Sequence, residues 1–185
     1  VQLASELFGV PVALISLIDS ERQWFKAKVG IDVCQTPRAI SFCTHVVSQG
    51  DMLVVSNALL DERFADNPLV TGELAIRFYA GAPLRLDAQH VIGTLCLLDH
   101  RPRRFGPRQQ ARLQQLADTL CELIRQRMLL QLAERQSKLL LTINQAQSSF
   151  LLDRDLGAAC STILHSLLAM SQTTLAFIAS CQVDD

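Results

Sequence analysis

Cys43 and His45 are neighbouring side chains whose types could bind a metal ion or carry covalent chemistry. They follow Ser41, a residue type that often caps the start of a helix, and precede Gly50, a common helix end. Each residue of a helix turns by about 100°, so side chains two positions apart point in nearly opposite directions and cannot bind one ion together. We therefore expect no metal site at this pair, and we predict that Cys43 packs toward the core.

The remaining cysteines form no metal or redox motif by their spacing. The sequence holds six cysteines, none of them in a CxxC pair or at zinc-finger spacing from histidine. Four lie in apolar runs, where a free thiol packs as a small hydrophobic side chain: Cys43, Cys96, Cys121 and Cys160. We expect these thiols to be reduced in a cytoplasmic protein. The phrases GxSxG, HExxH, GxGxxG and the P-loop do not occur either, so we expect no catalytic residues.

The segments around Cys43 predict an antiparallel sheet with covered faces. Val10–Ile18 is apolar on both faces, which indicates a central strand. Trp24–Val29 alternates between apolar and polar residues, as a more exposed strand does. A helix at Phe42–Gln49 and further strands at Met52–Val55, Phe78–Leu86 and Val91–Leu98 complete the pattern. Asn57–Arg77 is longer than an ordinary connection, and such loops are usually lids or binding loops.

A ligand pocket, if present, would be lined by the short helix, the lid and the strand that follows the lid. The candidate walls are Phe42, Cys43, Phe64, Leu69, Val70, Phe78 and Tyr79. The candidate polar contacts are Asn57, Asp66 and Arg77, of which Arg77 could meet an anionic ligand. The alternative interpretation treats the aromatic residues as core, and Asp66-Asn67-Pro68 as a turn or helix cap.

From Arg108 to Ser148 the sequence lacks glycine and proline, which predicts one helix of roughly 60 Å. Apolar residues along it follow heptad spacing in two registers, and we predict that they form a homodimer: Leu113, Leu116, Leu120 and Leu123, then Leu129, Leu132, Leu139 and Ile143. The alternative is that the second half folds back on its own domain. A further helix at Asp153–Ser171 and a strand at Thr173–Ser180 are also predicted.

Several phrases, in this order, resemble the GAF family of bacterial sensors, in the subgroup found with histidine kinases or diguanylate cyclases. The resemblance is carried by Phe8–Ser16, Gln23–Lys26, Ser41–His45, Asp66–Val70, Arg77–Leu84 and Ile92–Cys96. It implies an α+β fold with an antiparallel sheet of five or six strands, helices on both faces and a long signalling helix. It also implies a domain core at 1–106, an output helix at 107–150 and the start of a second, truncated GAF domain at 151–185.

The resemblance implies a non-catalytic sensory domain that binds an unidentified small ligand and signals through a dimeric helix to a downstream kinase or cyclase module. The family's cyclic-nucleotide signature, Asn-Lys followed by Phe-Asp-Glu, is missing, and so is the Cys-His pair of the tetrapyrrole-binding members, so we expect neither cofactor. Two alternatives remain open. One is a thiol enzyme of the free methionine sulfoxide reductase type using Cys34 and Cys43, although the Asp61–Gly72 lid holds no cysteine. The other is a purely structural dimerisation domain.

The distribution of charge predicts no nucleic-acid or membrane partner. The formal net charge is -1, which does not favour nucleic acid or an anionic membrane. The arginine-rich stretch Arg101–Arg112 has no interleaved aromatic platform and no opposing basic face, so we expect a solvated linker and no nucleic-acid site. No apolar run is long enough to span a membrane, and the opening residues are typical of the end of a helix that begins upstream.

Overall fold

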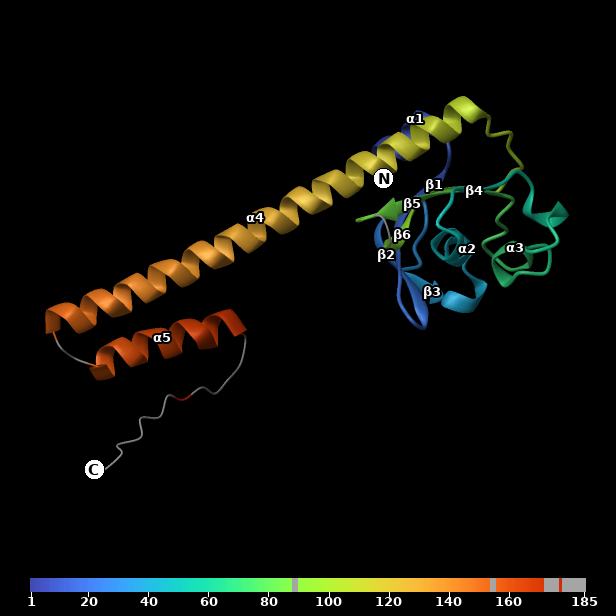
Figure 1. Cartoon of the computed structure of the whole chain (residues 1–185). Helices are drawn as coiled ribbons and strands as arrows, with labels where there is room; N and C mark the ends of the chain where they lie inside the picture. The colour runs from blue at the N-terminus through green and yellow to red at the C-terminus, as the bar shows by residue number, and fades with distance from the viewer. Residues whose placement is uncertain (88–89, 154–155, 172–176, 178–185) are drawn as a thin grey trace. The chain divides into compact units, whose positions relative to one another are not determined.

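The computed structural model describes residues 1–87, 90–153, 156–171 and 177 (Figure 1). The chain divides into two compact units, Val1–Arg125 and Gln126–Asp185. The boundary between them falls inside the helix α4 (Pro107–Asp153), so the first part of this helix belongs to the first unit.

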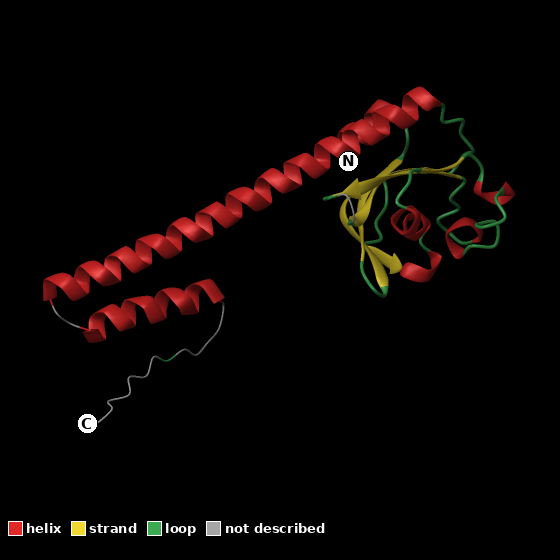
Figure 2. Cartoon of the chain, in the orientation of Figure 1, coloured by secondary structure: helices red, strands yellow, loops and turns green. Residues whose placement is uncertain are grey.

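The first unit is built on a six-stranded antiparallel sheet in the order β3-β2-β1-β6-β5-β4 (Figure 2). The strands are β1 (Val12–Ile18), β2 (Arg22–Val29), β3 (Gln35–Pro37), β4 (Leu53–Val55), β5 (Phe78–Arg85) and β6 (Val91–Asp99). The predicted sheet is confirmed, and β1 lies inside it between β2 and β6, as its apolar pattern indicated. The edge strand β3 has only three residues, too few to produce a recognisable alternation.

Helices cover both faces of this sheet, as the sequence predicted. On one face, α1 (Gln2–Phe8) and the first part of α4 pack in a cluster that includes Phe8, Leu97 and Leu113. On the other face, α2 (Phe42–Gln49), η2 (Ala58–Leu60) and α3 (Pro68–Thr71) cover a second cluster. This second cluster contains Tyr79 of β5 and Cys96 of β6, whereas Leu97, the next residue of β6, belongs to the first cluster. Consecutive strand residues therefore face opposite layers.

The short helix α2 begins and ends where the sequence predicted. The backbone N–H of Thr44 donates to Ser41 Oγ at 3.3 Å, which caps the start. Gly50 adopts the left-handed conformation at φ 76°, and its N–H donates to the Val46 carbonyl. These ends fix which side of α2 faces the sheet, and Cys43 and Val46 are buried there.

The second unit contains the rest of α4 and α5 (Leu156–Ser171). Thr142 and Ala146 are the buried residues of α4 in this unit, and Thr142 Oγ1 donates to Ser166 Oγ at 3.2 Å, so α5 packs against this part of α4. The long helix predicted at 108–148 is confirmed within the 47 residues of α4. The strand predicted at Thr173–Ser180 lies outside the described residues except for Phe177. No helix in the described ranges is long and apolar enough to cross a membrane.

Candidate functional site

A small cavity lies between α2, the segment from Asn57 to Arg77 and the sheet. It offers about 20 Å³ of space for the centre of a water-sized molecule, enough for roughly one water. Its lining is mostly apolar and comes from Leu14, Gln23, Phe25, Ile31, Thr36, Phe42, Cys43, Leu69, Leu74, Ile76, Tyr79, Cys96 and Leu98. Pockets for ordinary small ligands are several hundred Å³ in volume. The predicted pocket is therefore present in this state as a nearly filled cavity.

Aromatic side chains occupy much of the space beneath the lid. The rings of Phe42 and Phe64 stack with centroids 4.1 Å apart, and Phe42 stacks on Tyr79 at 5.1 Å. His45 meets the edge of the Phe64 ring at 4.9 Å. Phe64 is 1% exposed although it belongs to the irregular lid. The lid is thus anchored by a buried aromatic side chain, and these contacts hold it against α2.

The base of the cavity is a cluster of sulfur and hydroxyl groups around Cys43. Tyr79 Oη donates to Cys43 Sγ at 3.2 Å, and Gln23 Nε2 donates to the same sulfur at 3.1 Å. Cys96 Sγ lies 3.7 Å from Cys43 Sγ. Gly81 makes room for this arrangement, because a Cβ at that position would lie 2.1 Å from Tyr79 Oη.

Ionisation in this cluster is distributed unequally. Burial opposes ionisation of Cys43, but hydrogen bonds from Cys96 and from nearby hydroxyl groups outweigh it and lower the pKa of the Cys43 thiol to about 6. The hydrogen bond to Cys43, together with burial, raises the pKa of Cys96 well above its ordinary value. Burial likewise raises the pKa of Tyr79, which therefore keeps its proton and remains a donor. A single negative charge on this cluster would reside on Cys43.

Polar contacts tie the lid to the rest of the domain. Asn67 caps α3 by accepting from the Leu69 N–H at 2.8 Å, and its amide donates to the Ile40 carbonyl at 2.9 Å. Arg77 donates to the backbone carbonyls of Val70 and Ile76, at 2.8 and 3.1 Å. These hydrogen bonds of the Arg77 guanidinium therefore hold the lid backbone. Asn67 is a helix cap, as the alternative sequence interpretation had it.

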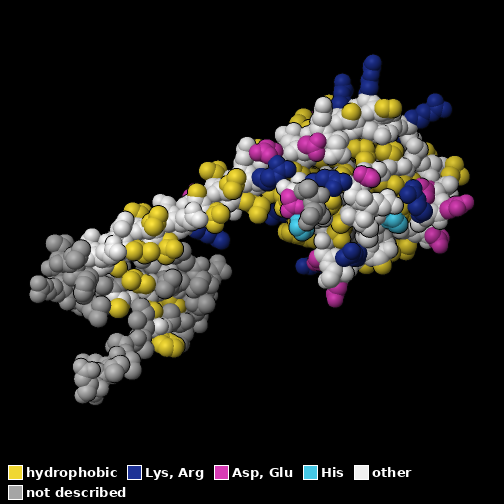
Figure 3. Space-filling model, in the orientation of Figure 1, with side chains coloured by type: hydrophobic (Ala, Val, Ile, Leu, Met, Phe, Trp, Pro, Cys, Tyr) yellow, Lys and Arg dark blue, Asp and Glu magenta, His cyan; other side chains and the backbone are white. Residues whose placement is uncertain are grey.

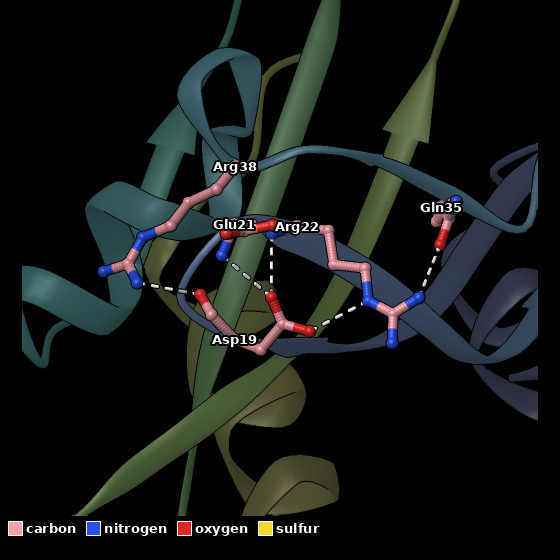
Figure 4. Close-up of polar contacts among 5 residues, drawn as sticks. All are labelled: Asp19, Glu21, Arg22, Gln35 and Arg38. Atoms are coloured by element: carbon pink, nitrogen blue, oxygen red, sulfur yellow. Dashed lines mark hydrogen bonds and ion pairs between the residues drawn. The ribbon is translucent and has the colours of Figure 1, made fainter.

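A surface network fixes the β1–β2 turn beside the cavity (Figure 4). Asp19 accepts hydrogen bonds from the Glu21 and Arg22 backbone and from Arg22 Nε, and these contacts lower the pKa of Asp19 to about 2. Arg22 also donates to Gln35 of β3, and Arg38 donates to the Asp19 carbonyl. The network holds β2 and β3 in register next to their cavity-facing residues, Gln23 and Thr36.

The predicted ligand-binding residues are only partly brought together. Four line the cavity: Phe42, Cys43, Leu69 and Tyr79. Phe64 and Val70 are buried in the same cluster. Phe78 faces the opposite layer and packs near Phe105, while Asn57 caps η2, Asp66 is exposed and Arg77 holds the lid. Gln23, Thr36 and Cys96 also line the cavity but were not predicted as pocket residues, although Gln23 shares the strand parity of the inward Phe25.

The predicted dimerisation residues fall into two groups. Leu113 is fully buried, and Leu116 and Leu120 pack against the same cluster, so these three contact their own domain. Leu123, Leu129 and Leu132 are 58%, 65% and 53% exposed. Leu139 and Ile143 are just over one third exposed. Figure 3 shows hydrophobic side chains on the surface of α4.

Within the described part of the chain, Cys96 is the thiol in contact with Cys43. Among the described residues, no group of three or more His, Cys, Asp or Glu side chains could hold a metal ion. Cys34 is exposed, with Lys28 Nζ 3.3 Å from its sulfur, and its recorded contacts do not include Cys43. The cavity is also too small for an amino-acid substrate in this state.

Comparison with known proteins identifies the class of this domain. The GAF domain family model matches residues 1–124, and the chain belongs to this family. A cyclic di-GMP phosphodiesterase of Pseudomonas aeruginosa is 49% identical over 104 residues, which are 56% of this chain and 17% of that protein. The chain thus spans less than a fifth of the length of this relative.

Solved structures with the same fold come from proteins of different functions. The GAF domain of an Acinetobacter phosphoenolpyruvate-protein phosphotransferase matches with a TM-score of 0.56 and 20% identity, over 70% of this chain and 80% of that one. A free methionine-R-sulfoxide reductase of Neisseria meningitidis, in complex with its substrate, matches at 0.54 and 19% identity, over 65% and 71%. At these identities the likeness concerns the fold alone.

Proposed function

We propose that this chain is a non-catalytic sensory domain of a cyclic di-GMP signalling protein, and that it acts as a homodimer through α4. The name of the Pseudomonas relative, which is 49% identical over 104 residues, supports the signalling context. The observation that carries the proposal is the group of exposed large apolar side chains in the middle of α4. These are Leu123, Met128, Leu129, Leu130 and Leu132, each at least 53% exposed. Such a surface on a helix is typical of a partner interface.

The sheet offers a route from the cavity to α4. In β6, Thr94, Cys96 and Leu98 belong to the cavity side of the sheet, and Leu95 and Leu97 belong to the α4 side. Leu97 lies in one cluster with Leu113 of α4. A change at the cavity that shifts β6 therefore acts directly on the packing of α4 in the first unit. A small ligand or a chemical change can move this equilibrium only by its differential free energy for the two states.

The dimer is tested by sedimentation velocity or light scattering on the whole chain. We expect a concentration-dependent dimer, and we expect Leu132→Glu to shift it to monomer because a carboxylate would be buried against apolar partners. Gln131→Glu adds the same charge at the adjacent exposed position and is the matched control. A chain that stays monomeric at high concentration, or a dimer that Leu132→Glu leaves intact, contradicts the proposed interface.

The sensory role is tested in a fusion in which this chain precedes its natural effector. Variants at the cavity, such as Phe42→Leu, should change the effector's cyclic di-GMP turnover, whereas variants at exposed residues of the same unit should not. Turnover by the isolated chain would contradict the non-catalytic part of the proposal.

A further inference from the structure

Cys43 and Cys96 form a buried pair of thiols that connects a helix to the centre of the sheet. Their sulfur atoms lie 3.7 Å apart, and the side chains belong to α2 and β6, 53 positions apart in the sequence. Cys43 is 2% exposed and Cys96 is fully buried. Both residues contribute to the lining of the small cavity. The pair thus combines close contact between sulfurs with a space that a very small molecule can occupy.

The surroundings single out Cys43 as the more nucleophilic sulfur. Tyr79 and Gln23 both donate to Cys43 Sγ, and the Cys96 sulfur lies 3.7 Å from it. The Thr36 hydroxyl donates to Gln23 Oε1 at 3.3 Å, and this contact turns the amide NH₂ group toward the sulfur. Two convergent donors suit a thiolate better than a neutral thiol, whose sulfur is a weak acceptor. The lowered pKa of Cys43 and the raised pKa of Cys96 follow from the same arrangement.

We propose that Cys43 and Cys96 are a peroxide-reactive dithiol, in which hydrogen peroxide oxidises Cys43 and the pair then closes into a disulfide between α2 and β6. The Cys43 thiolate attacks one peroxide oxygen, the O–O bond breaks, and the departing hydroxide takes up a proton to become water. The Cys96 sulfur then attacks the resulting sulfenic acid and loses its proton to the departing hydroxyl group, which leaves as a second water. Two thiols are oxidised, and one peroxide is reduced to two waters.

The cavity gives this reaction a size limit. Its outer wall includes the partly buried side chains of Ile31, Leu69 and Leu74, and rotation of such side chains is fast compared with thiol oxidation. The space of about 20 Å³ suits a water-sized molecule, so hydrogen peroxide fits far better than an organic hydroperoxide. This chemistry concerns the cavity alone and does not depend on the proposed dimer or on the downstream effector.

The test is oxidation of the intact, folded chain at neutral pH with a few equivalents of hydrogen peroxide, followed by alkylation of free thiols, digestion and mass spectrometry. We expect a Cys43–Cys96 cross-linked peptide that has lost two hydrogen atoms. In Cys96→Ala, we expect Cys43 to gain one oxygen atom as the sulfenic acid, which dimedone captures when it is added together with urea after the peroxide has been removed. Cys34→Ala removes an exposed thiol outside the cavity and is the control, so its cross-link should be unchanged.

Two further measurements distinguish oxidation of the Cys43–Cys96 pair in its cavity from unspecific oxidation of thiols. Tyr79→Phe removes one donor to Cys43, so the rate of cross-linking should reach half its maximum at a higher pH than in the unmodified protein. Cumene hydroperoxide should react at least tenfold more slowly than hydrogen peroxide. The proposal is overturned if Cys43 and Cys96 stay reduced while Cys34 is oxidised, or if the cross-link forms only after urea unfolds the chain. Equal rates for the two peroxides would overturn the cavity as the route of entry.

Discussion

Replacement of Phe64 by alanine should show whether the lid is held in place by this buried ring. Phe64 is 1% exposed and stacks on Phe42 at 4.1 Å. Truncation of a buried phenylalanine to alanine costs about 3–5 kcal/mol. The lid is irregular and can settle inward, so we expect the lower end, about 3 kcal/mol of unfolding free energy. For a urea dependence of about 2 kcal/mol/M, the unfolding midpoint then falls by about 1.5 M.

The assay is urea unfolding followed by the fluorescence of Trp24, the single tryptophan of the chain. Trp24 lies in β2, outside the lid, so it reports unfolding of the sheet. The matched control is Leu60→Ala, because Leu60 belongs to the same segment and is 81% exposed. We expect the control to change the unfolding free energy by less than about 0.5 kcal/mol. If the two variants lose equal stability, the lid is not anchored through Phe64.

Phe64→Ala should also create a dry apolar cavity, and such cavities bind benzene. Benzene-saturated buffer should therefore raise the unfolding midpoint of Phe64→Ala and leave the unmodified protein unchanged. A rise in both proteins would mean that the pocket already opens without the substitution.

Three other perturbations give distinct expectations. Gly81→Ala should cost about 1–3 kcal/mol in urea unfolding, because its Cβ would lie 2.1 Å from a tyrosine hydroxyl, whereas Gly106→Ala meets no atom within 4 Å and should be neutral. Asn67→Ala should cost about 1–2 kcal/mol through the lost cap and amide contact, and the exposed neighbour variant Asp66→Ala should not. The pKa of Asp19 is lowered from 3.8 to about 2 in the folded state. Its contribution is therefore present above about pH 4, and the difference in thermal midpoint between Asp19→Asn and the unmodified protein should vanish as the pH falls toward 2.

The layered fold was predictable because its signals are local. Ser41 and Gly50 mark the ends of α2 by side-chain and backbone chemistry that acts within one turn. The apolar run of β1 requires cover on both faces, whatever the partners are. The length of α4 follows from the lack of glycine and proline after Arg108. Each of these properties depends on residues that are consecutive in the sequence.

The site was less predictable because it depends on register between distant segments. Phe78 and Tyr79 are consecutive residues of β5, so their side chains lie on opposite faces of the sheet. The sequence does not show which of the two faces the lid, and both were therefore predicted as pocket walls. Cys96 joins Cys43 only through the sheet order that puts β6 beneath α2. Arg77 is a charge at the entrance of a strand, and only the fold shows that its donors meet lid carbonyls.

The closed cavity limits what this domain can detect in the state described here. A ligand of ordinary size could enter this cavity only if lining side chains such as Phe42 and Tyr79, whose rings are stacked, moved apart. The free energy of that opening reduces the apparent affinity by the population of the open state. An opening free energy of about 3 kcal/mol would reduce the affinity roughly a hundredfold. Hydrogen peroxide is much smaller than such a ligand, so it needs far less opening of the space beside Cys43 and Cys96. The same sheet that holds these sulfurs on one face carries Leu97 against α4 on the other, so closing the sulfur pair would act on β6 where α4 is packed. A sensor with this interior is therefore better suited to a chemical change of its own side chains than to a bulky ligand.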